Sequence, residues 1–212
     1  MYAKKLPITG HVKNYATIYI FMVILFLTGV IFGAIIVNSM SFVQKQDLFF
    51  YLERFFGQLI DAGYIENSEI LKSSFLYHMK YLLLLFVLGL SVIGLPLVWV
   101  LLFLKGLVVG FSVGFIVNQL GFQGFLLAAT AIAPQNFLII PIYIVASSLA
   151  MIFSLSLLGK LFSRKMPQPV VQPLGRYAAT FTILLGVSFF AAMLEAYVAG
   201  GAMRIIVESF YN

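Results

Sequence analysis

Long uncharged apolar stretches alternate with short polar segments along most of the chain. A helix that rises about 1.5 Å per residue needs roughly 20 apolar residues to cross about 30 Å of hydrocarbon. Four stretches meet this requirement, and they cover residues 16–37, 81–104, 135–158 and 177–201. Glu195 is the only charged residue within them. The pattern therefore predicts helices that span a lipid bilayer.

A fifth, shorter apolar run covers residues 106–120, between Lys105 and a glycine-rich turn. It would reach roughly 22 Å, so we expect a short span. The apolar sequence then resumes at residues 125–158, where Pro134 and Pro141 interrupt helical hydrogen bonding. We expect a fourth span broken at these prolines, and its start is either a re-entrant half-helix or a bend.

The basic residues orient these five spans. With the N-terminus inside, eight of the 13 lysines and arginines fall on the inner side and five on the outer side. Cytoplasmic loops carry an excess of Lys and Arg, so we expect N-in, C-out topology. Residues 38–80 then form an external loop and residues 159–176 a cytoplasmic linker. The first span is longer than the roughly 7–15 apolar residues of a signal peptide, which predicts an uncleaved signal anchor.

Composition agrees with a membrane solvent. Hydrophobic residues make up 62% of the 212 residues and charged residues 9%, and the mean hydropathy is +1.06. A soluble globule of this size cannot bury so much apolar surface. We therefore expect one all-α membrane domain over residues 1–212, a polytopic helix bundle whose first partner is the lipid bilayer.

The same composition limits the chemistry. The chain has no cysteine, and its two histidines, His11 and His78, stand far apart in the sequence, which leaves little for a metal site. The net charge of +6 belongs to residues that flank spans, so it does not indicate a nucleic-acid partner. We expect no cofactor, and no Ser/His/Asp set is visible that would make the protein an enzyme.

The external loop contains an amphipathic helix over residues 47–61. A helical wheel at about 100° per residue collects its apolar side chains on one face. This face covers either the protein's own bundle and the outer leaflet or an external partner. Interfacial membrane helices usually carry a Lys-rich polar face, whereas this one is of mixed charge. The candidate partner-docking residues are Leu48, Leu52, Phe55, Phe56 and Leu59.

Glycine recurs at every fourth position of the third span, at Gly106, Gly110 and Gly114. Such a ladder forms a flat groove on one helix face and lets a neighbouring backbone approach closely. It predicts a helix-packing surface. The neighbour is either another span of the same chain or a second copy in a homo-oligomer.

Polar residues near the spans form a second set of candidates. Glu195 lies about 27 Å along its span from Tyr177, close to the outer headgroups, with Lys80 or Arg204 as a neighbour. It is either a structural carboxylate or a partner contact or proton site. The amide side chains can bridge helices or line a cavity; they are Asn118, Gln119, Gln123, Gln135 and Asn136.

The segment Ala133-Pro134-Gln135-Asn136-Phe137-Leu138-Ile139-Ile140-Pro141 resembles the signature region of the stage II sporulation protein M family. The broader family tends to show Pro-His-Gly-x-x-Glu-x-Pro. Pro134 and Pro141 match at the right spacing, while Gln135, Asn136 and Ile139 stand where the motif has His, Gly and Glu. The resemblance extends over most of the chain, from the basic N-terminus to the last span.

The resemblance implies a multi-pass protein of the mother-cell septal membrane that is needed for engulfment of the forespore. It implies that stage II sporulation proteins D and P, which degrade peptidoglycan, are held on the outer side. We therefore expect a non-catalytic scaffold. The alternative is a small transporter or permease-like subunit, because discontinuous helices often mark binding sites near the bilayer midplane.

Overall fold

The computed structural model describes residues 13–61, 67–162 and 171–199 of the protein. These ranges contain helices and short turns but no strand, which confirms the all-α prediction. Five helices are long and apolar enough to cross a membrane, as predicted. They are α2 (Ala16–Ser39), α4 (Asn67–Gly89), α5 (Gly94–Leu127), α6 (Ala133–Phe162) and α7 (Val171–Leu194). The remaining elements are α3 (Phe42–Asp61) and two π-helices, η1 (Ala128–Ile132) and η2 (Glu195–Ala199).

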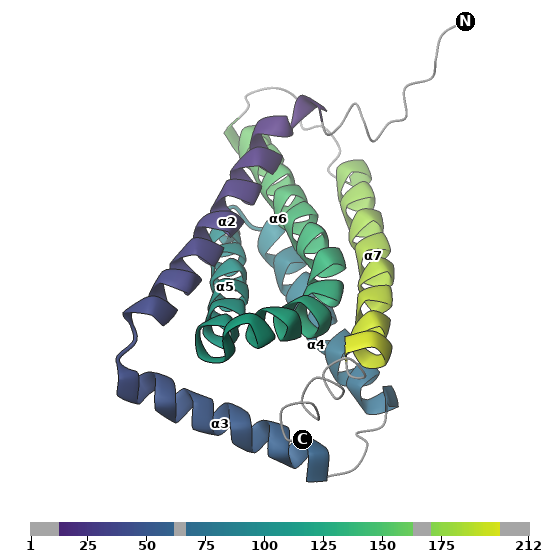
Figure 1. Ribbon diagram of the computed structural model, residues 1–212. Helices are drawn as coiled ribbons and strands as arrows, with labels where there is room; N and C mark the ends of the chain where they lie inside the picture. Colours follow the sequence, from purple (N-terminus) through teal and green to yellow (C-terminus); the bar gives the residue numbers. More distant parts are fainter. Residues whose placement is uncertain (1–12, 62–66, 163–170, 200–212) are drawn as a thin grey trace, which may run out of the picture.

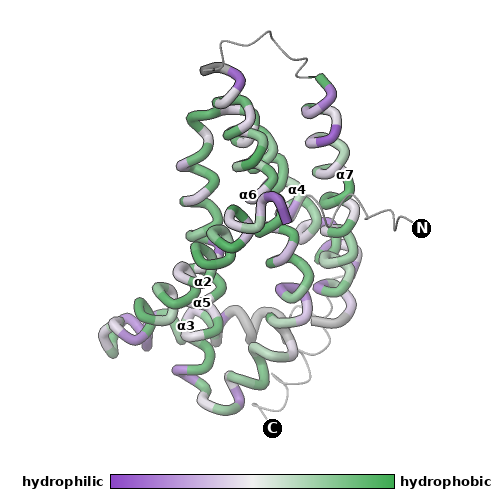
Figure 2. The backbone as a smooth tube through the Cα atoms, turned by 90° about the horizontal axis from the view of Figure 1, so that it is seen from above, coloured by the Kyte–Doolittle hydropathy of each residue, from purple (hydrophilic) through white to green (hydrophobic). Residues whose placement is uncertain are grey.

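The five long helices form a bundle in which α5 and α6 lie between α2 and α7 (Figure 1). Helix α3 crosses one end of the bundle, which we call the α3 end. The core takes fully buried side chains from several helices, among them Met22, Leu82, Leu102 and Tyr143. Many large apolar side chains of these helices are exposed, and apolar residues run along most of each helix (Figure 2). A helix that is apolar all round suits a lipid environment.

Helices α2 and α5 touch backbone to backbone along the glycine ladder. A Cβ atom at Gly106 would overlap the carbonyl oxygen of Phe26, and one at Gly110 would overlap that of Val30. Only glycine allows two helices to approach so closely. The ladder therefore faces another helix of the same chain.

Helix α2 contributes its own glycines to this contact. A Cβ atom at Gly29 or Gly33 would overlap backbone atoms of α5. At one end of the same contact, the ring of Trp99 on α5 packs edge-on against Phe21 of α2, with 5.4 Å between the ring centroids. Aromatic pairs favour this edge-to-face arrangement.

The prediction of one span over residues 81–104 is wrong. The chain turns at residues 90–93, between α4 and α5. Gly94 opens α5, and Pro96 lies in its first turn, where a proline's missing N–H costs little. Lys105, which the sequence suggested as a loop residue, lies inside α5 and is half-buried.

The fourth span is not broken at its prolines. Pro134 lies in the first turn of α6, and α6 continues through Pro141. The interruption comes earlier, at Gly121 with φ 58° and ψ −131°, a conformation open to glycine. From there the chain runs across the α3 end of the bundle and enters α6 through η1 (Figure 1). The start of the fourth segment is therefore a helical arm that crosses the bundle and bends into α6.

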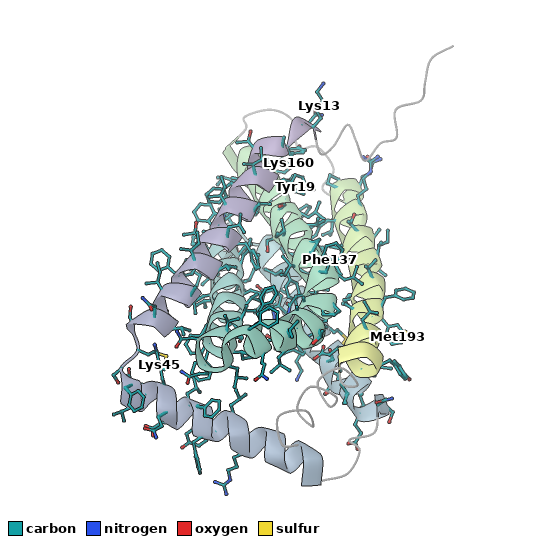
Figure 3. The ribbon with its side chains drawn as sticks, in the orientation of Figure 1. Lys13, Tyr19, Lys45, Phe137, Lys160 and Met193 are labelled. Carbon is teal, nitrogen blue, oxygen red and sulfur yellow. The ribbon has the colours of Figure 1, made fainter. Side chains whose placement is uncertain are left out.

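Basic side chains mark the two ends of the bundle. Lys13 and Lys160 lie at the end opposite α3, while Lys45 lies at the α3 end (Figure 3). The predicted inner segments thus share one end. Because Lys105 lies inside α5, the number of lysines and arginines on the predicted inner side falls by one. The N-in, C-out orientation remains a prediction, and it makes the α3 end the outer one.

Candidate functional site

A polar cavity of about 430 Å³ lies between α4, α5, the start of α6, and η2. Apolar residues of α5 and α6 form part of its wall, and a cluster of polar side chains from four helical elements forms the rest. The polar lining residues are Ser73, Ser74, Tyr77, His78, Lys105, Ser112, Gln135, Asn136 and Glu195. Polar and charged groups inside a membrane bundle are costly, so their convergence marks a candidate site.

Glu195 is the first residue of η2 and stands at one side of this cavity. Its carboxylate accepts a hydrogen bond from the hydroxyl of Ser74. With the Gln135 amide oriented to suit its neighbours, the amide nitrogen donates to the two carboxylate oxygens over 2.6 and 3.1 Å. The Nε2 atom of His78 lies 3.7 Å from the same carboxylate. Three groups from α4 and α6 therefore compensate the burial of this charge.

His78 links the carboxylate to the centre of the bundle. Its side chain is buried, its Nδ1 lies 2.7 Å from the hydroxyl of Tyr143, and its Nε2 lies 3.3 Å from the hydroxyl of Ser74. Ser74 and His78 are four residues apart on α4, a spacing that places them on one face. Each ring nitrogen thus has a hydrogen-bonding partner, as buried polar groups require.

The Ser74, His78 and Glu195 cluster corrects the expectation that no such set would form. Its geometry nevertheless differs from a nucleophilic triad, in which the carboxylate holds the imidazole from the side opposite the serine. Here the serine and the carboxylate lie on the same side of the ring, at Nε2, and the serine donates to the carboxylate. In this arrangement the proton of the Ser74 hydroxyl is directed to Glu195 and not to His78.

Lys105 lies at a different part of the cavity wall, surrounded by tyrosines. Its ammonium donates to the hydroxyl of Tyr77 over 3.3 Å. It also lies 4.8 Å from the ring centre of Tyr77, 5.1 Å from that of Tyr143 and 5.9 Å from that of Tyr81. Electron-rich ring faces attract a cation. Within the described residues, no carboxylate forms an ion pair with Lys105.

The predicted docking helix exists, but part of its apolar face turns toward the protein itself. Leu48 is half-buried, and Leu52 packs against the small cluster of Ile116 and Leu127. The side chains of Phe55, Phe56 and Leu59 lie outside the described part of the chain. The aromatic residues that the described part of α3 exposes are instead Phe42, Phe50 and Tyr51, with exposed fractions of 78%, 60% and 67%.

The residues of the family motif divide between the cavity and the helix backbone. Gln135 and Asn136 line the cavity, and the Asn136 amide donates to the carbonyl oxygen of Ile132 over 2.8 Å. Pro134 and Pro141 belong to α6. The other predicted amides do not join them in the lining, because Asn118 and Gln123 are exposed and Gln119 lies elsewhere on α5.

Glu195 contacts other residues than the sequence suggested. Lys80, one expected neighbour, is exposed on α4, and Arg204 lies outside the described residues. Sequence reasoning missed Ser74, His78 and Tyr143. The i, i+4 spacing of Ser74 and His78 was visible, but the expected span began after them and left both in the external loop. Their partners on α6 and η2 only become neighbours in the folded chain.

The chain was also compared with known proteins. A family model described as Stage II sporulation protein M matches residues 22–200. No curated protein and no solved structure gives a significant match. The matched region includes every lining residue of the cavity.

Proposed function

The chain belongs to the stage II sporulation protein M family, and from this membership we propose that it organises peptidoglycan hydrolases for engulfment of the forespore. The family and the five apolar helices together make it a multi-pass sporulation membrane protein. In the proposed role it is a non-catalytic scaffold in the mother-cell septal membrane. Its partners are stage II sporulation proteins D and P.

The observation that carries this proposal is the way α3 is held. Leu52 packs against Ile116 and Leu127 of α5, while Phe50 and Tyr51 are exposed. Aromatic residues are enriched at protein interfaces and among the few residues that supply most of the binding energy. In the predicted orientation this surface lies on the outer side, where enzymes that act on the cell wall are found.

The proposal is tested by co-purification from sporulating cells. Phe50→Asp with Tyr51→Asp should leave the protein inserted at wild-type levels but lose the hydrolases. Phe55→Asp with Phe56→Asp tests the rest of the predicted docking face in the same way. The matched control is Val171→Asp with Leu174→Asp, two residues at the opposite end of the bundle, of which Val171 is exposed to 78%. If both α3 variants retained the hydrolases as the control does, docking through α3 would be wrong.

The non-catalytic part of the proposal is supported by the arrangement around His78. The serine and the carboxylate share one side of the imidazole, so no nucleophile is activated in the manner of a triad. Ser74→Ala in the same cells should therefore leave engulfment intact. A variant that inserts normally and yet abolishes engulfment would point to chemistry at Ser74.

The cavity favours transport as a second candidate function. Polar side chains that line a cavity between membrane helices are typical of solute pathways. Because the chain has no cysteine, a single cysteine at Ser112 can be labelled cleanly. A transporter should react with impermeant reagents from both sides of the membrane. Reaction from one side only, with Ser41→Cys as the control for the α3 end, would favour the scaffold.

A further inference from the structure

We propose that the cavity is a binding site for a zwitterion, a small group that carries an ammonium next to a phosphate or carboxylate. The anionic part would bind Lys105 and the cationic part Glu195. This inference does not depend on the scaffold proposal, since it concerns the inside of the bundle and not its outer surface.

Lys105 is suited to an anion. Its ammonium has three N–H donors, and within the described residues it makes one hydrogen bond, to the hydroxyl of Tyr77. The surrounding tyrosine rings stabilise the positive charge without accepting its remaining protons in conventional hydrogen bonds. Two donors thus remain for a ligand, and an oxygen anion satisfies both the charge and the donors.

Glu195 is suited to a cation with N–H donors. A carboxylate offers about four lone-pair sites, while Ser74 and Gln135 together supply three hydrogen bonds. Two of these converge on one oxygen, so the other oxygen keeps capacity. His78 lies 3.7 Å from Oε2, the oxygen that already accepts two hydrogen bonds, so it does not occupy the other carboxylate oxygen.

The two charges line one cavity without pairing to each other. Opposite charges that share a membrane cavity without pairing are costly, and a ligand with the complementary pair of charges contacts both. The cavity volume of about 430 Å³ falls within the roughly 300–1,000 Å³ of small-molecule sites. Val109 and Ile139 give the remaining wall an apolar character that accommodates a short carbon chain.

An ammonium joined to a phosphate can come from two sources, a free solute or the headgroup of an aminophospholipid. The first experiment addresses the solute. Phosphoethanolamine is titrated into the full chain in nanodiscs, next to the two half-ligands, ethanolamine and inorganic phosphate. We expect each half-ligand to bind about tenfold more weakly or worse, because each loses one charged hydrogen-bonding partner.

The second experiment addresses the lipid. The protein is purified from nanodiscs of phosphatidylethanolamine mixed with phosphatidylglycerol, and the retained lipid is identified by mass spectrometry. Selective retention of phosphatidylethanolamine would place the source in the bilayer, and binding of phosphoethanolamine alone would place it in solution. Either result supports the zwitterion site.

Variants link the binding to the two charges. Lys105→Met and Glu195→Gln should each weaken binding about tenfold or more, while Lys80→Met, an exposed lysine on α4, should leave it unchanged. If Glu195→Gln disturbs the fold, Val109→Phe fills the cavity with both charges present and should abolish binding. Equal binding of inorganic phosphate and phosphoethanolamine, insensitive to Glu195→Gln, would overturn the proposal. Absence of selective binding to both the solute and the lipid would overturn it as well.

Discussion

Replacing Gly110 with alanine tests the contact between α2 and α5. The added Cβ would lie 2.7 Å from the carbonyl carbon of Val30 and closer still to its oxygen. Non-bonded carbons rest about 3.5–4.0 Å apart, so the two helices would have to separate by roughly 1 Å. Overfilling a packed interior in this way costs about 1–3 kcal/mol.

A matched substitution on the same helix isolates this steric cost. A Cβ at Gly114 would lie 3.5 Å from the Cα of Ala34, an ordinary contact. Both substitutions gain the same helix propensity, about 1 kcal/mol for alanine over glycine. The difference in unfolding free energy between Gly110→Ala and Gly114→Ala should therefore equal the steric cost, about 1–3 kcal/mol.

The free energy of unfolding is measured in mixed micelles by titration with a denaturing detergent, with circular dichroism as the signal. Gly110→Ala should unfold at lower detergent than the wild type, and Gly114→Ala at the same or higher detergent. If the two variants unfolded together, the backbones of α2 and α5 would not approach each other as described.

Three further predictions concern the cavity and the topology. Tyr143→Phe removes the hydroxyl 2.7 Å from His78 and should lower the unfolding free energy by about 1–3 kcal/mol. The control Tyr197→Phe, at a residue exposed to 58%, should leave the unfolding free energy unchanged. Equal effects of the two substitutions in the same detergent titration would contradict the burial of His78. A double-mutant cycle of Gln135→Leu and Glu195→Gln should give a coupling of about 0.5–3 kcal/mol, and additive losses would remove their hydrogen bonds from the site. In intact cells, Lys45→Cys should react with an impermeant maleimide and Lys160→Cys only after permeabilisation; the reverse would invert the orientation.

The bundle was predictable because apolar length alone identifies membrane helices. The number of spans came from the sequence in this way, and the glycine ladder came from the regular spacing of Gly106, Gly110 and Gly114. The family match agrees with the resemblance carried by Pro134 and Pro141. The helix boundaries were harder. The turn at residues 90–93 contains Leu, Ser, Val and Ile, so no charged residue marks it.

Lys105 was misplaced for a physical reason. A charge inside a span is expensive, so the sequence favours placing a lysine in a loop. Three tyrosines from α4 and α6 surround its ammonium and make the interior position tolerable. These rings come from two helices, and nothing in the local sequence of α5 indicates them. The contact between His78 and Glu195 was missed on the same grounds, since it depends on the packing of α4 against η2.

The fluorescence of Trp99 can report on the contact between α2 and α5. Trp99 is the chain's single tryptophan, it packs against Phe21 at the junction of α2 and α5, and its buried Nε1 has no hydrogen-bonding partner among the described residues. Intrinsic emission excited at the red edge of the absorption band therefore arises from one indole in a dry environment. A shift of that emission to longer wavelength would signal water or a polar group reaching this junction, with no dye attached and no residue replaced.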